Sequence, residues 1–137
     1  MCDPNPDRRR TDMSTTMTNE LTSLNPATGE LIEVPTKGVN PYGIQMDSQG
    51  MLWIGFNGSA MLGRLDPNTM ELEYYDLPDP ASRVRRVALA SDDMVWFVNS
   101  SLGALGRLNP KTGEVTEWPS PSGPDTHPYA IEVVDDI

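Results

Sequence analysis

The sequence is poor in cysteine, histidine and basic residues. Its 137 residues include one cysteine, one histidine and 10 Lys+Arg against 20 Asp+Glu, so the formal net charge is −10. The single Cys2 excludes an internal disulfide framework and a zinc site built on several cysteines. The acidic balance argues against a nucleic-acid partner, which would need a basic patch, and against docking on an anionic membrane surface. No apolar run approaches the roughly 18–20 residues of a transmembrane helix.

The first residues also lack the apolar segment of a secretory signal. The stretch 1–18 is polar and carries three successive arginines at 8–10, and we interpret it as a disordered tail. Cys2 lies in this stretch with no base beside it, so catalysis there is not expected. Without a signal or a transmembrane segment, the sequence favours a cytoplasmic location.

What the sequence does contain is an internal repeat. Residues 62–67 read Leu-Gly-Arg-Leu-Asp-Pro, and residues 105–110 read Leu-Gly-Arg-Leu-Asn-Pro, 43 residues later. The same spacing separates Trp53 from Trp96. A partial copy precedes the first repeat at 24–30, and residues 128–131 begin another, matching 41–44. Several positions that keep one spacing establish a true repeat. The period of such a repeat indicates which class of fold the chain adopts.

Each full repeat holds four short segments of strand composition. The 13 prolines and 11 glycines of the chain mark many turns. Asp66-Pro67 and Asn109-Pro110 predict tight turns, because proline fixes φ while Asp or Asn accepts hydrogen bonds from nearby N–H groups. The predicted strands are 42–47, 51–56, 61–65 and 71–75 in the first repeat, 85–90, 94–99, 104–108 and 114–118 in the second, and Tyr129–Val134 after it.

Four antiparallel strands in a 43-residue period are typical of one β-propeller blade. We therefore predict an all-β fold, a partial β-propeller with about three blades' worth of residues. Such a number of blades is too small to close a ring. The predicted parts are the last two strands of a blade at 19–35, full blades at 41–78 and 84–119, and the first strand of a further blade at 128–137.

The blade starts supply the candidate binding residues. In a propeller the first strand of each blade lines the central channel, so equivalent residues at the strand starts should converge. A cluster of Tyr, Arg and His there predicts a small-molecule site in which arginine suits a carboxylate, and a solvated polar rim is the alternative. The two equivalent sets are Tyr42, Arg85 and Tyr129, and Asn40, Arg83 and His127.

His127 is also the one candidate for proton transfer near neutral pH. It lacks the carboxylate partners that a metal site would need, so no metal ligands are predicted, and a plain loop position is the alternative. Four other residues recur in both repeats and are predicted to be structural, the tryptophans in the core between blades and the arginines as pairing groups. These are Trp53, Trp96, Arg64 and Arg107.

These motifs resemble those of the virginiamycin B lyase family, also called streptogramin lyases. The matching segments are Pro-Tyr-Gly-Ile at 41–44, Gly-Met-Leu-Trp-Ile at 50–54, Leu-Gly-Arg-Leu in both repeats, and the ends at 73–78 and 117–119. The resemblance covers about residues 19–135 and implies part of a seven-bladed propeller. It further implies a magnesium-dependent elimination that opens the ester of a cyclic depsipeptide without water.

The family's catalytic set is not reproduced in this sequence. The family pairs Glu-Pro-His at a blade start with a Glu four residues after the blade's Trp. Here the start reads His127-Pro128-Tyr129, and the positions after the tryptophans are Asn57 and Ser100. We therefore predict a lyase-like propeller in which this chain alone does not catalyse, and magnesium enters only through the resemblance. The alternatives are a non-catalytic module that binds a small molecule, peptide or glycan, and a piece that self-associates through open blade edges.

Overall fold

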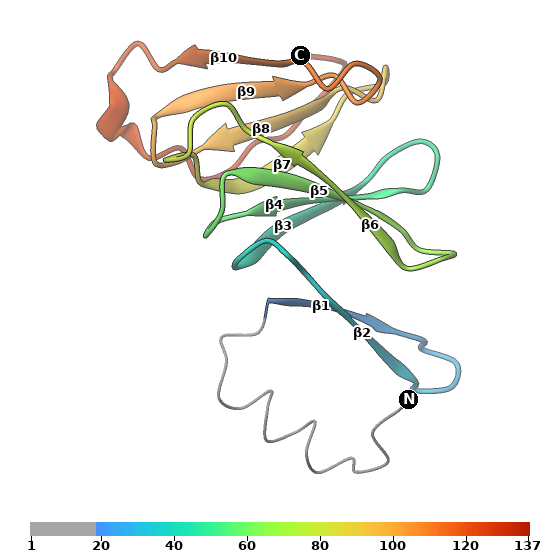
Figure 1. The fold of residues 1–137 in the computed structure, drawn as a ribbon. Coiled ribbons are helices and arrows are strands. Elements are labelled where there is room, and N and C mark those ends of the chain that lie inside the picture. The colour runs from blue at the N-terminus through green and yellow to red at the C-terminus, as the bar shows by residue number, and fades with distance from the viewer. Residues whose placement is uncertain (1–18) are drawn as a thin grey trace.

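The computed structural model describes residues 19–137, and these form an all-β fold of three antiparallel sheets (Figure 1). The first sheet is a hairpin, and the other two are four-stranded blades whose strands pair in sequence order. The partial propeller predicted from the repeat is confirmed. The strands are β1 (Glu20–Leu24) and β2 (Leu31–Pro35) in the hairpin, β3 (Pro41–Met46), β4 (Leu52–Phe56), β5 (Met61–Asp66) and β6 (Glu71–Asp76) in the first blade, and β7 (Val84–Leu89), β8 (Val95–Asn99), β9 (Ala104–Leu108) and β10 (Val115–Pro119) in the second.

The turns between outer strands follow from one side-chain hydrogen bond that recurs. Asn25, Asp66 and Asn109 each accept a bond at Oδ1 from the backbone N–H two residues later, at 3.0, 2.9 and 3.0 Å. This local bond holds the chain in a turn at the end of one strand and aims it back along the next. The sequence pattern Leu-(Asn/Asp)-Pro therefore places the same turn in the hairpin and in both blades.

The core lies between successive sheets. One cluster joins the two blades and includes Trp53 from β4, Val87 from β7 and Phe97 from β8. A second joins the hairpin to the first blade through Val34, Ile54 and Phe56, among others. Because side chains alternate across a strand, each blade buries one face against the preceding sheet and offers the other to the next.

The two blades differ in how well their forward faces are covered. Trp53 on the first blade is 0 % exposed, because the second blade packs over it. The equivalent Trp96 on the second blade is only half-buried, and it stacks on Trp118, whose exposed fraction is 41 %. Equivalent residues therefore have different surroundings, set by the neighbouring sheet and not by the repeat itself.

The strand expected at Tyr129–Val134 does not form. After β10 the chain makes a short 3₁₀ turn, η1 (Pro124–Thr126), and residues 127–137 contain no strand. A blade's first strand forms its ladder with the second strand of the same blade, and none of the described strands pairs with residues 127–137. The prediction did not take into account that a strand needs a neighbouring strand with which to form hydrogen bonds.

The C-terminal segment nevertheless keeps the position of a blade's first strand. Ser91 donates from its backbone N–H and its hydroxyl to the carboxylate of Asp136, at 2.9 and 2.6 Å. Ser48 makes the same two bonds to Asp93, 43 residues earlier. We call each such pair of serine–aspartate hydrogen bonds a clip. Because the clip recurs, residues 128–137 lie against the second blade as the second blade lies against the first. The tail predicted for 1–18, with Cys2, lies outside the described residues.

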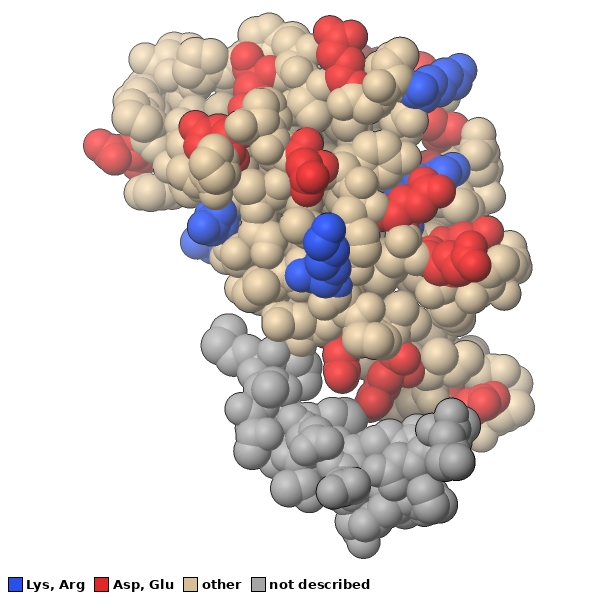
Figure 2. Space-filling model, in the orientation of Figure 1, with Lys and Arg blue, Asp and Glu red and all other residues tan. Residues whose placement is uncertain are grey.

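Carboxylates are scattered over the visible face of the molecule, with a few separate basic side chains among them (Figure 2). Within residues 19–137, no helix has the length and apolarity needed to cross a membrane.

Candidate functional site

The first strands of both blades carry an irregularity at the same place. The ladder between β3 and β4 shifts register between Pro41 and Gly43, and that between β7 and β8 shifts between Val84 and Val87. Such bulges leave residues out of the ladder and redirect their side chains, and they are common beside functional sites. The residues released in this way are Tyr42 on β3 and Arg85 and Arg86 on β7.

These released side chains meet Tyr129 from the C-terminal segment. The hydroxyl groups of Tyr42 and Tyr129 share a short hydrogen bond, and their rings meet edge to face with centroids 6.1 Å apart. The guanidinium of Arg85 lies 5.0 Å from the Tyr129 ring centroid. The guanidinium of Arg86 lies 5.3 Å from the Tyr42 ring and 5.7 Å from the Tyr129 ring. We call Tyr42, Arg85, Arg86 and Tyr129 the first-strand cluster.

The close approach of the two first strands depends on Gly43. A Cβ atom at this position would lie 2.5 Å from the Arg85 carbonyl oxygen and 2.9 Å from the Arg86 Cα. No side chain fits at those distances, so only glycine lets β3 approach the backbone of β7 here. The glycine of the Pro-Tyr-Gly-Ile motif thereby brings Tyr42 within reach of both arginines.

The arginines change the acidity of the tyrosine pair. The hydrogen bond from Tyr42 and the facing guanidinium of Arg86, with a smaller contribution from Arg85, lower the pKa of Tyr129. The same hydrogen bond to Tyr129 raises the pKa of Tyr42. Tyr129 is therefore the first of the two to ionise, with Tyr42 as the hydrogen-bond donor to its phenolate.

The first predicted set is thus brought together, whereas the second is joined only in part. The backbone carbonyls of Asn40 and Arg83 accept hydrogen bonds from the N–H groups of Asn57 and Ser100, respectively. His127 also bonds to Ser100, so Arg83 and His127 share this partner and Asn40 does not. The Arg83 guanidinium donates to the carbonyl oxygens of Pro80 and Ser82, at 3.0 and 2.6 Å, and is therefore held by its own loop.

His127 is exposed and bound to the backbone of the second blade. Its Nδ1 lies 3.0 Å from the carbonyl oxygen of Ser100, with which it shares a hydrogen bond. Ser100 occupies the position where the resemblance places a carboxylate ligand. A carbonyl and an imidazole that already bond to each other leave no donor set for a cation.

The magnesium implied by the resemblance therefore does not fit the residues described. Divalent magnesium takes oxygen ligands, usually from carboxylates. No group of three or more His, Cys, Asp or Glu side chains among residues 19–137 is placed to hold a metal ion. We derive no chemical step through a metal from this part of the chain.

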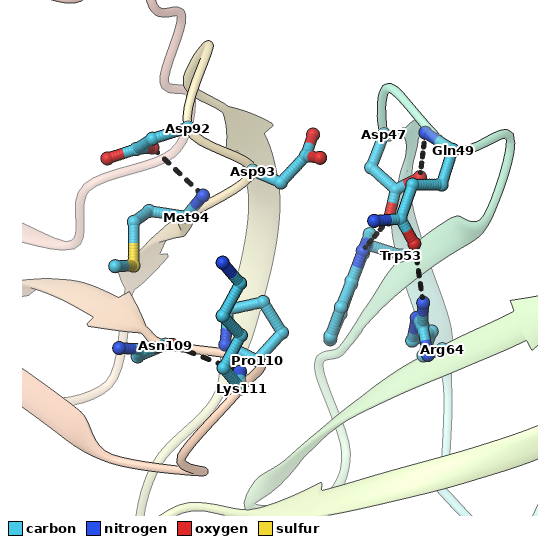
Figure 3. Close-up of a pocket in the computed structure, with 10 residues that line it drawn as sticks. All are labelled: Asp47, Gln49, Trp53, Arg64, Asp92, Asp93, Met94, Asn109, Pro110 and Lys111. Carbon is cyan, nitrogen blue, oxygen red and sulfur yellow. Dashed lines mark hydrogen bonds between the residues drawn. The ribbon is translucent and has the colours of Figure 1, made fainter.

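A separate cleft of about 430 Å³ lies between the two blades, next to the turns that join their first and second strands (Figure 3). Its walls carry Trp53 and Arg64 on one side and Asp93 and Lys111 on the other. The volume falls in the range of small-ligand pockets. We call this feature the inter-blade cleft.

The polar groups of the inter-blade cleft mostly bond to the protein itself. The carboxylate of Asp47 accepts the Trp53 indole N–H at 2.9 Å and two turn N–H groups, and that of Asp93 accepts both donors of Ser48. The hydrogen bonds from Ser48 are the main cause of the lowered pKa of Asp93. Arg64 lies over the Trp53 ring at 5.8 Å and pairs with Glu73 at 3.7 Å. The Ser48–Asp93 bonds join the first blade to the second. The other contacts lie within the first blade, where Arg64 is the cross-strand neighbour of both Trp53 and Glu73.

The arginine of Leu-Gly-Arg-Leu repeats this arrangement in the second blade. Arg107 lies 5.5 Å from the ring centroids of both Trp96 and Trp118. In both blades this arginine packs on the tryptophan of the neighbouring strand in the same sheet. Arg86 was not predicted as a member of the cluster, because the bulge that adds it leaves no signal in the strand pattern.

Comparison with known proteins adds to this geometry. The model of the Virginiamycin B lyase family matches residues 27–136. The structure of a catalytically inactive histidine-to-alanine variant of virginiamycin B lyase from Staphylococcus aureus with quinupristin is similar at a TM-score of 0.78 and 26% identity. A streptogramin B lyase structure is similar at 0.77 and 27% identity. Each match covers 87% of this chain and 40% of the other chain.

A more distant match shares the fold alone. Hydrazine synthase from Kuenenia stuttgartiensis is similar at a TM-score of 0.60 with 15% identity, over 74% of this chain and 28% of that one. No curated protein matches the sequence. The chain spans about 40% of the length of the lyase structures, so it corresponds to a part of their propeller.

Proposed function

Because the chain belongs to the virginiamycin B lyase family, we propose that it forms part of the ligand-binding wall of a lyase-like propeller, with the first-strand cluster as its contact site. The ligand is a cyclic depsipeptide of the streptogramin B type, because the family resemblance implies a cyclic depsipeptide and the similar structures are virginiamycin B lyase with quinupristin and a streptogramin B lyase. Binding rather than catalysis is assigned to residues 19–137, because they lack a metal-binding group.

The observation that carries this proposal is the convergence of the cluster. Its four residues come from three successive blade starts, far apart in sequence, and bulges on both strands release three of them from the ladders. Tyrosine and arginine are the residues that most often anchor a bound partner. Tyr42 and Tyr129 are 38 % and 48 % exposed, so ring surface remains available to a ligand.

The test is a calorimetric titration of the 137-residue chain with quinupristin. We expect saturable binding that Tyr129→Ala weakens by about tenfold, the loss of one good contact. Arg107→Gln is the matched control, because it removes an arginine from aromatic rings outside the cluster. Binding that is absent, or equally strong in Tyr129→Ala, would contradict the proposal.

A second reading, that the chain is a complete magnesium-dependent lyase, predicts a different outcome. It requires magnesium to strengthen quinupristin binding and the depsipeptide to be opened, which chromatography detects as a product of unchanged mass. We expect neither effect, since the family's Glu positions hold Asn57 and Ser100 and the family's Glu-Pro-His reads His127-Pro128-Tyr129.

A further inference from the structure

We propose that the first-strand cluster recognises a carboxylate, held by the guanidinium groups of Arg85 and Arg86 beside the two tyrosine rings. This inference rests on the proposed function and names the chemical group that the site receives. It concerns binding only, and no residue of the chain is assigned a covalent step.

The first argument is an excess of positive charge in an acidic protein. Arg85 and Arg86 are neighbours on β7, and their side chains gather over the same pair of rings. Among residues 19–137, no carboxylate lies within ion-pair distance of either guanidinium, whereas Arg64 has Glu73 at 3.7 Å. Two adjacent arginines that have no acidic partner within the described part of the chain, in a protein of net charge −10, leave a place for an anion.

The second argument is an unused donor. The Nε–H of Arg85 is buried and has no hydrogen-bond partner among the described residues. The Nε–H of Arg64 is in the same state, but the Arg64 guanidinium has Glu73 at 3.7 Å, whereas that of Arg85 has no carboxylate within ion-pair distance among residues 19–137. Buried donors without a partner are rare in folded proteins and call for an explanation. The planar guanidinium fork matches the two oxygens of a carboxylate, which can accept two parallel bonds from it.

The third argument concerns the rings. Tyr42 and Tyr129 meet edge to face and keep part of their surface exposed beside the cations. A carboxylate attached to an aromatic group can place its charge on the arginines and its ring on a tyrosine. The site should therefore prefer an aromatic carboxylate to a simple aliphatic one.

A carboxylate also has a clear source in the elimination that the family resemblance implies. A base takes the proton from the carbon next to a carbonyl, and the C–H electron pair forms a C=C bond to the neighbouring carbon. The alkyl C–O bond of the ester at that neighbouring carbon breaks, and its electron pair remains on the released carboxylate. The opened depsipeptide thus carries an anion that the closed one lacks. The cluster would bind the opened form more tightly than the closed form.

Tyr129 provides a direct readout of occupancy. The titratable and charged groups that face it are Tyr42 from β3, and Arg85 and Arg86 from β7. An anion on the arginines offsets the positive charge that favours the Tyr129 phenolate, so binding must raise the pKa of Tyr129. By linkage, ionisation of Tyr129 must weaken the binding of the anion to the same degree.

The experiment follows the tyrosinate absorbance near 295 nm against pH, with benzoate, acetate and inorganic phosphate as probes. In the free protein the first tyrosine to ionise should disappear in Tyr129→Phe. We expect benzoate to raise its pKa and to bind about tenfold more weakly to Arg86→Gln. Arg86→Lys should recover part of the affinity, and Arg107→Gln should behave as the parent.

Each outcome decides the matter. A pKa of Tyr129 that benzoate leaves unchanged, or an equal shift in Arg86→Gln, overturns the proposal. Tighter binding of phosphate than of benzoate would identify a phosphate site and overturn the carboxylate assignment. Quinupristin binding without benzoate binding removes this inference and leaves the proposed function standing. Benzoate binding without quinupristin binding would contradict the proposed function and leave the carboxylate site standing.

Discussion

Two regions of the molecule place arginine over aromatic rings, and they differ in what the charges do. In the inter-blade cleft, Arg64 lies on Trp53 and pairs with Glu73, and the nearby carboxylates of Asp47 and Asp93 accept protein donors. In the first-strand cluster, Arg85 and Arg86 lie on tyrosines with no carboxylate within ion-pair distance among the described residues.

The difference separates structure from function within one fold. The contacts of the cleft recur from blade to blade: Arg107 lies over Trp96 as Arg64 lies over Trp53, each within its own blade, and Ser91 bonds to Asp136 as Ser48 bonds to Asp93. The cluster does not recur, because it combines two arginines and two tyrosines from different blade starts. In this protein, a pair of arginines without an ion-pair partner among the described residues therefore indicates a binding site better than a pocket of suitable volume does. Changes in the cleft should cost stability, and changes in the cluster should cost binding.

The largest expected effect is at the aromatic residue of the cleft. Trp53→Ala removes a side chain that is 0 % exposed, so we expect unfolding by urea to show a loss of about 3–5 kcal/mol. Trp96→Ala, at the equivalent half-buried position, should cost no more than about 2 kcal/mol. Equal losses in the two variants would mean that the second blade's forward face is as well covered as the first.

The next effect links the two regions through Gly43. A Cβ at Gly43 would meet backbone atoms of β7 at 2.5 and 2.9 Å, so Gly43→Ala must move one strand and should cost about 1–3 kcal/mol. It should also return the pKa of Tyr129 toward its ordinary value by separating Tyr42 from the arginines. Gly63→Ala, which faces the Phe56 ring at 3.0 Å, is the control. If Gly43→Ala leaves the pKa of Tyr129 unchanged, the glycine does not control the position of Tyr42 beside the arginines.

The Ser48–Asp93 clip beside the cleft should make a smaller, pH-dependent contribution. Its hydrogen bonds depress the pKa of Asp93 below the ordinary value of 3.8, so the bonded state is the carboxylate. The stabilisation is present above the pKa of the unfolded chain and is lost as pH falls through the lower folded pKa. Ser48→Ala should thus cost under about 1 kcal/mol near neutrality, given the exposure of the pair.

Unfolding curves of the parent and Ser48→Ala at a series of pH values measure the contribution of this clip to the free energy of unfolding. The two should converge as the pH falls below the ordinary value of 3.8 and through the lower folded pKa of Asp93, where the folded carboxylate becomes protonated. Ser91→Ala gives the matching test at Asp136, whose pKa the hydrogen bonds from Ser91 also lower. A difference between parent and variant that grows toward low pH would show that the clip acts in another protonation state.

The smallest effect on stability is expected in the cluster itself. Arg86 is exposed and forms no ion pair with a described residue, so Arg86→Gln should change the free energy of unfolding, measured with urea, by less than about 0.5 kcal/mol. The same variant should weaken benzoate binding. A large loss of stability in Arg86→Gln would assign the cluster a structural role and remove the contrast with the cleft.

Much of the fold could be predicted from the repeat. The period, the Asn/Asp-Pro turns and the alternating apolar residues fixed the two full blades, because each blade's strands pair with their sequence neighbours. The strand at Tyr129–Val134 could not be judged in the same way. Whether a segment becomes a strand depends on a pairing partner, and a match to residues 41–44 carries no information on that partner.

The candidate site was predictable in part. Because the starts of the first strands are equivalent in the repeat, Tyr42, Arg85 and Tyr129 were predicted to converge, and the structure places them in contact. The sequence could not show that Arg83 and His127 both bond to Ser100 while Asn40 bonds to Asn57, since loop hydrogen bonds depend on local geometry. Nor could it show Arg86, whose direction is set by a bulge that the alternating pattern hides.

The most direct test is hydrogen–deuterium exchange of the 137-residue chain with and without quinupristin. It compares the two regions in one sample without any substitution. We predict slower exchange on binding at the bulged starts of β3 and β7 and at residues 128–131, with no change in the cleft turns at 47–50, 91–94 and 109–111. Protection confined to those turns would contradict the account, because it would place the ligand in the inter-blade cleft.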